Sequence, residues 1–373
     1  MTESDAAMFR RLSRNLVLIA STLALVSCGG ARVSKLTDAE VQQMVAKIDT
    51  STDPDFIYEY DKTKFVPPEG KVLLMQGQTV EGITEYLQAF PDEPLPGGWA
   101  AYWAVTEFRG VAEKHLNSTG SSQHHQMLAD RFPNAAIHSA MWMVGMWLIT
   151  ERAVKGEFDE VIEQYGKWAK RTQRPIYLRI GYEFDGPHNE LDPVEYVAAY
   201  HRIVDKLRDM GVDNIAYVWH SYASPTYKGH PISAWYPGDD YVDWVGVSVF
   251  EHAYGDVSMG PDNEEVLAFA KAHSKPVMIA ETNPVRGISR DDAAVWDEWF
   301  VKFFSYIHNK NIKAVSFINE NWDRLTIPGI EAWEDARLYN NPDISRAWFE
   351  ETNKDHYLKA SPQLFHQLGY TPE

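Results

Sequence analysis

The chain has 373 residues, of which 45% are hydrophobic and 24% charged, so it can bury a substantial core. This composition excludes a disordered or low-complexity chain. A net charge of -18, from 35 Lys and Arg against 53 Asp and Glu, argues against a nucleic-acid partner, because a phosphate-binding surface needs a basic stripe. One cysteine excludes an internal disulfide. The 13% of aromatic residues suits either a large core or a cleft that stacks sugars.

Residues 1–27 are typical of a secretory signal. An apolar run over residues 16–26 follows a stretch with three arginines, and it is shorter than the ~20 residues that span a bilayer. The run ends in Leu25-Val26-Ser27-Cys28, which resembles the lipobox of bacterial lipoproteins. The resemblance implies a lipid anchor on Cys28 and a place in the bacterial cell envelope, with Gly29 favouring the outer membrane. The alternative is an ordinary signal peptide.

Residues 28–70 are expected to form a tether, one helix and a connecting segment. Thr37 and Glu40 have the spacing of a capping box and precede apolar positions at helical intervals, which predicts a helix over residues 38–48. Residues 49–70 show no period, and we expect them to pack on the main body.

Residues 71–355 alternate short apolar runs with helical patterns. Continuous apolar runs separated by helices indicate parallel strands that are covered on both faces. Eight such units predict a (β/α)₈ barrel, with a doubly wound open sheet as the competing fold. No glycine-rich phosphate loop follows any run. Residues 356–373 form a C-terminal extension that we expect to cover the barrel wall. The eight runs are residues 72–75, 101–106, 135–143, 176–180, 215–219, 242–250, 277–280 and 314–318.

Two glutamates stand at the ends of predicted strands. Glu183 ends the fourth strand, which also carries Arg179, and Glu281 ends the seventh. In such a barrel the chemistry lies at the carboxyl ends of the strands, so both carboxylates can face one cleft. Paired carboxylates are what glycosidic bond cleavage needs, one as proton donor and the other as nucleophile or base. Spacing does not say which glutamate has which role, and each could instead be a carboxylate of the barrel rim.

Three stretches resemble clan A of the glycoside hydrolases, and within it family 26, the β-mannanase family. They are residues 179–186, 235–246 and 275–281, and the likeness spans roughly 135–325. It implies that Glu183 is the acid/base and Glu281 the nucleophile of a retaining mechanism. We expect Arg179 and nearby donors to keep Glu281 ionised, and a less polar setting to raise the pKa of Glu183.

The resemblance also implies residues that line the substrate cleft. His138 corresponds to a histidine of the glycone site, Trp322 to the tryptophan under the bound sugar, and Phe250 to the tyrosine that orients the nucleophile. The chain departs from the family in three places. Tyr182 replaces the histidine before the acid/base, Phe250 lacks the tyrosine hydroxyl, and Pro187-His188-Asn189-Glu190 replaces an aromatic cluster. These departures put mannan specificity in doubt.

Further residues at strand ends are candidates for substrate binding. Trp219 and His220 end the fifth strand, and Arg179 and Tyr182 flank Glu183. His220 could equally be a rim histidine bound to backbone. Glu251 and His252 follow the sixth strand and are expected to be ordinary loop residues. The histidines lack companions at ligand spacing, so we expect no metal and no cofactor.

These observations predict an envelope-anchored retaining β-glycoside hydrolase, an endo-acting, mannanase-like enzyme. We expect a monomer whose partners are a polysaccharide or oligosaccharide substrate and the membrane lipid, without nucleic acid. One alternative is a catalytically inactive glycan-binding lipoprotein, which the lost family features motivate. A transglycosylase on the same barrel is another. The sugar, its linkage and the mode of cleavage stay open.

Overall fold

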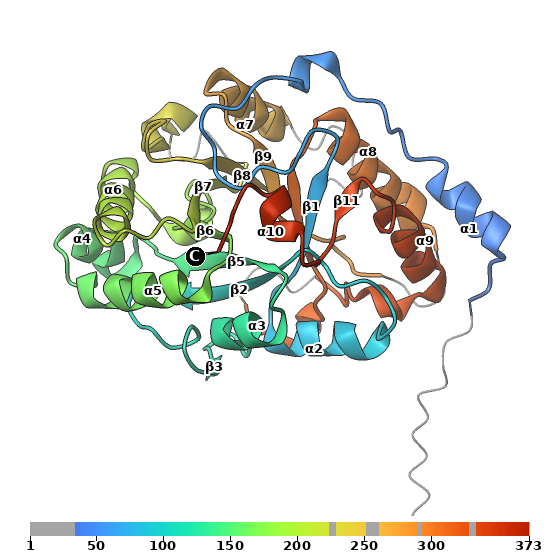
Figure 1. The fold of residues 1–373 in the computed structure, drawn as a ribbon, viewed down its shortest axis with the longest axis horizontal. Helices are drawn as coiled ribbons and strands as arrows, with labels where there is room; N and C mark the ends of the chain where they lie inside the picture. The colour runs from blue at the N-terminus through green and yellow to red at the C-terminus, as the bar shows by residue number, and fades with distance from the viewer. Residues whose placement is uncertain (1–33, 224–228, 251–260, 289–292, 328–332, 373) are drawn as a thin grey trace, which may run out of the picture. The chain divides into compact units, whose positions relative to one another are not determined.

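The computed structural model describes residues 34–223, 229–250, 261–288, 293–327 and 333–372, and residues 34–373 form one compact unit. Eight parallel strands close into a barrel, because the last strand pairs with the first from Leu73 opposite Ala314 to Gly77 opposite Ile318. This confirms the predicted (β/α)₈ barrel (Figure 1). The strands are β1 Val72–Gly77, β2 Gly98–Ala104, β5 Ala136–Trp142, β6 Ile176–Ile180, β7 Ile215–Ser221, β8 Trp244–Val249, β9 Val277–Thr282 and β10 Ala314–Ile318.

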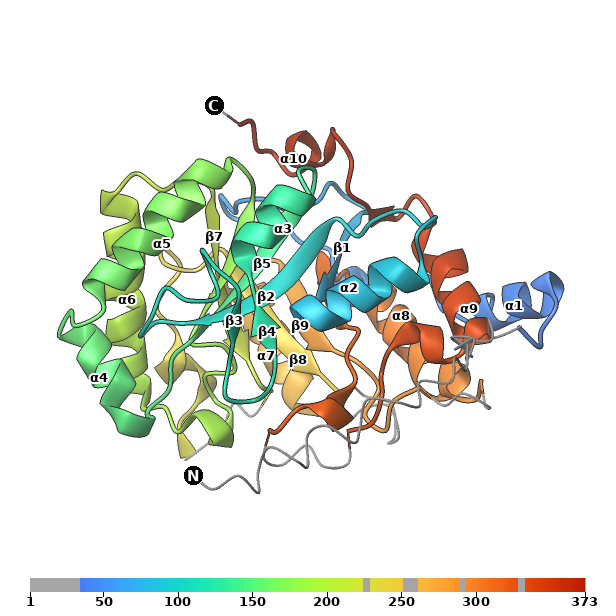
Figure 2. The ribbon, with the colours of Figure 1, turned by 90° about the horizontal axis from the view of Figure 1, so that it is seen from below.

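Helices surround the barrel and cover its outer face (Figure 2). The helix predicted over residues 38–48 is confirmed as α1, where Thr37 and Glu40 make both hydrogen bonds of the capping box. None of the helices in the described ranges is long and apolar enough to span a membrane. The helices are α1 Asp38–Val45, α2 Val80–Ala89, α3 His125–Arg131, α4 Ile149–Val154, α5 Asp159–Thr172, α6 Pro193–Asp209, α7 Pro261–Ala272, α8 Val301–Asn309 and α9 Pro342–Thr352.

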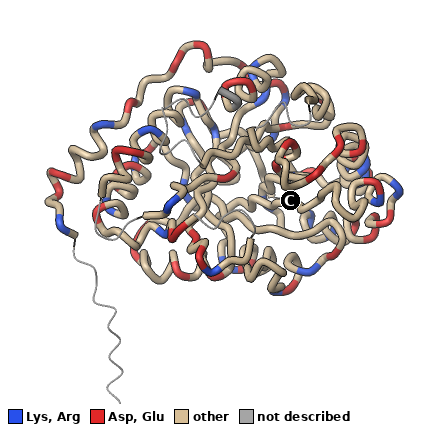
Figure 3. Tube along the Cα trace, turned by 180° about the vertical axis from the view of Figure 1, so that it is seen from behind, with Lys and Arg blue, Asp and Glu red and all other residues tan. Residues whose placement is uncertain are grey.

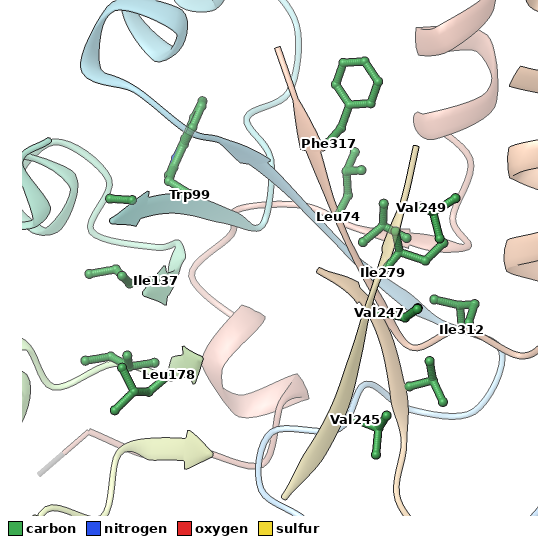
Figure 4. Close-up of a cluster of buried hydrophobic side chains, with 14 of the residues drawn as sticks. Leu74, Trp99, Ile137, Leu178, Val245, Val247, Val249, Ile279, Ile312 and Phe317 are labelled. Atoms are coloured by element: carbon green, nitrogen blue, oxygen red, sulfur yellow. The ribbon is translucent and has the colours of Figure 1, made fainter. Parts of the chain in front are cut away.

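The main core lies between the strands and the helices. Alternate residues of each strand, such as Leu74, Ile137 and Leu178, point outward into it (Figure 4). Because successive side chains of a strand face opposite sides, the residues between them point into the barrel. Charged residues instead gather on the outside of the molecule, where acidic and basic side chains are interspersed (Figure 3).

The amino-terminal end of the barrel is closed by the segment before β1 and by the segment after α9. Phe65, from the segment before β1, packs with the inward-facing residues of the strands, together with Leu364, Leu368 and Tyr370. The helix α10 (Leu364–Gln367) therefore lies across this end (Figures 1 and 2). We had expected the extension to cover the barrel wall. The helices already cover the wall, whereas the apolar residues at this end need a cover of their own.

The capping role of α10 predicts a stability effect. Leu364 has no exposed surface, so Leu364→Ala leaves a cavity beneath the barrel and should lower the free energy of unfolding by about 2–5 kcal/mol. Urea unfolding followed by circular dichroism measures it. Gln367→Ala, on the exposed side of the same helix, is the control and should change stability by less than about 0.5 kcal/mol. Equal stability of the two variants would contradict the capping role.

Candidate active site

Glu183 and Glu281 lie at the carboxyl end of the barrel, after β6 and at the end of β9. Both are largely buried, with 6% and 8% of their surface exposed. They are close enough for the charge of Glu183 to raise the pKa of Glu281. The structure therefore brings the two predicted carboxylates into one site.

The backbone at Glu183 is strained and is held by the loop that follows. Glu183 has a φ of 53°, in the left-handed region that a residue with a side chain rarely adopts. Asn189 donates from Nδ2 to the carbonyl oxygens of Tyr182 (2.9 Å) and Glu183 (3.0 Å). Asp185 accepts hydrogen bonds from the Ser221 hydroxyl (2.7 Å) and the Tyr222 N–H, which fix the loop to the end of β7. Strain of this kind clusters at functional sites, where the surroundings enforce it.

Glu281 reaches the inside of the barrel through an irregularity of β9. The register between β8 and β9 shifts after Val247, so that Ser248 lies opposite Glu281. Ala280 already faces inward. In a regular strand the next residue would face out, and the extra residue turns Glu281 inward as well.

A buried cation and a phenol bind one oxygen of Glu281. The fully buried guanidinium of Arg179 donates to Oε1 through Nη1, and the Tyr102 hydroxyl donates to the same oxygen at 2.6 Å. Arg179 also lies against the rings of Tyr102 and Tyr182, at 5.1 and 5.4 Å. Because both hydrogen bonds fall on Oε1, Oε2 is the oxygen left to face a ligand.

Hydrogen bonds connect the two carboxylates through the inside of the barrel. Nη1 of Arg179 lies 3.3 Å from Nδ1 of His220, and Nε2 of His220 lies 3.0 Å from Oγ of Ser248. Ser248 in turn donates to Oε1 of Glu183. Arginine can only donate, so Nδ1 of His220 accepts and Nε2 carries the proton. His220 is thus neutral, in agreement with burial and the charge of Arg179, which hold its pKa well below the usual value.

The second oxygen of Glu183 contacts a histidine of the following loop. Nε2 of His188 lies 2.9 Å from Oε2, and the His188 side chain is 47% exposed. Burial lowers the pKa of His188, but the hydrogen bond and the charge of Glu183 outweigh it, so the pKa is raised. Since Ser248 already donates to Oε1, a proton on Glu183 belongs on Oε2, beside His188.

Opposing effects act on the pKa of Glu281. Burial raises its pKa, and the opposing charge of Arg179, with the hydrogen bonds from Tyr102 and Arg179, does not cancel the rise. Arg179 and Tyr102 favour the ionised form, and the expectation that Arg179 keeps Glu281 ionised stays a prediction.

Two predicted substrate contacts lie away from the carboxylates. Trp219 is fully buried in the outer core, where it stacks on Phe184 with ring centroids 4.5 Å apart. The assignment of Trp219 to the cleft is corrected, because His220 faces into the barrel and its neighbour must face out. His138 faces inward but lies deeper than Arg179, since it pairs with Tyr177 whereas Ala140 pairs with Arg179. It has no exposed surface.

Phe250 and Trp322 form an apolar wall beside the site. Phe250 follows β8, and Trp322 begins the short 3-10 helix Trp322–Arg324 after β10. Both pack against Trp333, with ring centroids 4.6 and 4.9 Å apart. Trp322 is only 6% exposed, so in this structure it is mainly part of an aromatic cluster. Cys28, Glu251 and His252 lie outside the described residues.

Sequence reasoning missed three residues of the site: Tyr102, His188 as a partner of Glu183, and Ser248. Tyr102 supplies the hydroxyl on Glu281 that the family expectation assigned to the position of Phe250. The sequence contains only part of the information that would identify these residues. Alternation along β2 and β8 could place Tyr102 and Ser248 inside the barrel, but not beside a particular carboxylate. Across the described residues, no three His, Cys, Asp or Glu side chains are grouped to hold a metal ion.

Two buried, linked carboxylates at the carboxyl ends of the strands of a (β/α)₈ barrel are the arrangement that glycoside hydrolysis uses. The chain belongs to glycosyl hydrolase family 26, whose profile matches residues 152–341. A β-1,3-xylanase, TXYA, from a Vibrio species is 31% identical over 333 residues, which are 82% of this chain and 70% of that protein. A β-1,3-xylanase from an Alcaligenes species is 31% identical over 336 residues, covering 83% and 69%. The chain is therefore a glycosidase.

Solved structures share the fold. The endo-β-1,4-mannanase of Cellulomonas fimi superposes with a TM-score of 0.54 at 16% identity, over 79% of this chain and 74% of that one. The family 26 β-mannanase BoMan26A of Bacteroides ovatus gives a TM-score of 0.55 at 12% identity, over 88% and 96%. At these identities the likeness supports the barrel and says nothing about the sugar.

Proposed function

We propose that this glycosidase is a retaining enzyme in which Glu183 is the acid/base and Glu281 the nucleophile. One observation carries the proposal. The two carboxylates end β6 and β9 and are joined through Arg179, His220 and Ser248 by hydrogen bonds that leave Oε2 of each without a bond inside that chain. The resemblance of residues 179–186 and 275–281 to clan A motifs gives the same roles.

In the first step, Glu183 gives the proton on its Oε2 to the glycosidic oxygen. The bond from that oxygen to the anomeric carbon breaks while Oε2 of Glu281 forms a bond to the same carbon. The leaving chain departs as an alcohol, and Glu183 becomes a carboxylate. The negative charge forms beside Nε2 of His188, which lies 2.9 Å from Oε2 and stabilises the charge as a hydrogen-bond donor.

In the second step, a water molecule replaces the leaving chain. Glu183 takes a proton from the water while the oxygen of the water attacks the anomeric carbon. The bond between that carbon and Oε2 of Glu281 breaks. Glu183 is protonated again and Glu281 is again a carboxylate, on which Arg179 and Tyr102 stabilise the returning charge. Two displacements on one carbon retain its configuration.

We further propose β-1,3-linked xylan as the substrate. Both relatives at 31% identity are β-1,3-xylanases, whereas the mannanases share only 12–16% of their residues with this chain. The departures at Tyr182, Phe250 and residues 187–190 also lead away from the mannanase pattern. Release of reducing ends from β-1,3-xylan, with little from β-1,4-mannan, is the expected outcome of a substrate panel with product sizing.

Removal of the nucleophile tests the mechanism. Glu281→Ala should fold normally and lower turnover of β-1,3-xylan by at least about 10³-fold, the order of magnitude that loss of a catalytic group costs. With an aryl β-glycoside and azide, activity should return and the product should be the α-glycosyl azide. The matched variant Glu183→Ala should give the β-glycosyl azide instead, because its covalent intermediate still forms. Nuclear magnetic resonance of the products measures both configurations.

Glu190→Ala is the control, because Glu190 is exposed on the same loop and touches neither carboxylate. It should retain full activity. Near-normal turnover by Glu281→Ala would refute the roles proposed here. If the wild-type chain binds the polysaccharide without releasing reducing ends over days, the glycan-binding alternative holds. Products longer than the substrate would indicate transglycosylation.

The hydroxyl of Tyr102 predicts a pH effect. It donates to Glu281 and lowers the pKa of that carboxyl, so Tyr102→Phe should raise the pKa further. The nucleophile must be ionised to act, and activity is lost as the pH falls through its pKa. The acidic limb of kcat/KM should therefore move to higher pH, by roughly 0.5–1 unit at about 1.4 kcal/mol per unit.

Tyr86→Phe makes the same chemical change in the outer core, where Tyr86 packs against Phe90 and Trp99. Its acidic limb should stay where the wild-type limb lies. An unmoved limb in Tyr102→Phe would show that the hydroxyl does not tune Glu281.

We also propose that Cys28 carries the lipid that anchors the protein in the bacterial cell envelope, an inference that rests on Leu25-Val26-Ser27-Cys28. Cys28→Ser should move the protein from the membrane fraction to the soluble fraction of a bacterium that processes lipoproteins, as immunoblotting would measure. A variant that stays in the membrane fraction would contradict the anchor.

A further inference from the structure

An exposed aromatic residue lies at the carboxyl end of the barrel, on the loop between β5 and α4. Trp147 is 71% exposed and its neighbour Leu148 is 59% exposed. Both belong to the 3-10 helix Met146–Leu148, and both have positive φ, 55° and 57°. Bulky residues rarely adopt this conformation, and large apolar side chains are usually buried. Positive φ and exposure of a large apolar side chain, found together on two successive residues, indicate a functional surface.

A second tryptophan lies next to Trp147. Trp142 ends β5 at the mouth of the barrel, where strand alternation directs it toward the side of His138 and Ala140, and part of its side chain packs against the main core. It is half-buried, and its ring centroid is 6.3 Å from that of Trp147 at an interplanar angle of 47°. The two rings form an angled aromatic surface, which we call the tryptophan platform.

The platform is tied to the loop of the proposed acid/base. The N–H of Gly145 donates to the carbonyl oxygen of Asn189 at 2.9 Å, and the Asn189 side chain holds the carbonyl of Glu183. The contact is tight, because a Cβ on Gly145 would lie 1.9 Å from the carbonyl oxygen of Glu190. Glycine is therefore required at residue 145, and the two loops hold a fixed relation.

We propose that the tryptophan platform is a sugar-binding subsite, which takes pyranose rings of the substrate chain beyond the bond that is cleaved. This inference rests on the proposed function. Tryptophan faces stack on the apolar C–H faces of sugars and bury a large area. The platform stands on the loop beside residues 187–190, where the family's aromatic cluster is missing.

Substrates of different length distinguish the effect of a distal subsite from an effect on the catalytic centre. A polysaccharide reaches the platform, whereas an aryl xyloside occupies only the centre. Trp147→Ala should lower kcat/KM on β-1,3-xylan at least tenfold more than kcat/KM on the aryl xyloside. Trp147→Tyr keeps an aromatic face, so this variant should retain most of the wild-type kcat/KM on β-1,3-xylan. In the Glu281→Ala background, Trp147→Ala should also abolish the retardation of the protein in gels that contain β-1,3-xylan.

Ile57→Ala is the control. Ile57 is 58% exposed and lies at the amino-terminal end of the barrel, since Asp53 and Asp61 of its segment bind the backbone after α8 and α7. It should leave both rates and the gel mobility unchanged. Equal loss on both substrates, or unchanged polymer activity and retardation in Trp147→Ala, would overturn the subsite. Failure of the wild-type chain to cleave either substrate would instead refute the proposed function.

Discussion

The buried guanidinium of Arg179 is the group on which the arrangement of the site depends. A charge without exposed surface inside a barrel is costly unless it is paired. Glu281 supplies the opposite charge, and the rings of Tyr102 and Tyr182 lie against the cation. The carboxylate that meets this demand is the one that ends β9. The need to neutralise Arg179 therefore fixes the position of Glu281 at the centre of the mouth.

Because arginine only donates, it also sets the direction of the hydrogen bonds beyond it. His220 must accept at Nδ1, which makes it a donor at Nε2, and Ser248 passes this direction on to Oε1 of Glu183. A neutral His220 between a cation and a hydroxyl has no alternative tautomer that satisfies both neighbours. One consequence is that these hydrogen bonds fall on Oε1 of each glutamate, and Oε2 of each lies outside this chain of hydrogen bonds. The two sides of the site are thus oriented by one buried cation.

The sequence predicts the barrel well, because its evidence is periodic and repeated. All eight apolar runs are strands, and Glu183 and Glu281 were found because each stands at a strand end. The features that the sequence could not predict depend on the register between neighbouring strands. The shift between β8 and β9 that turns Glu281 inward leaves no mark in composition. Trp219 was misassigned because its neighbour His220 takes the inward position. The partners Tyr102, Ser248 and His188 come from three separate segments, which only the closed barrel brings together.

Positive φ values occur at both ends of the barrel, and Phe65 adopts one at the amino-terminal end without ending a helix. At the amino-terminal end, Gln173 and Asn311 adopt them where α5 and α8 stop, and a left-handed residue at a helix end is an ordinary way to stop a helix. At the carboxyl end, Trp147 and Glu183 adopt them without ending a helix. There Asn189 holds the conformation, because its side chain donates to the carbonyl oxygen of Glu183 and its own backbone carbonyl accepts from the N–H of Gly145. The loops at the carboxyl end therefore hold Glu183 and Trp147 in strained backbone conformations at the same mouth of the barrel.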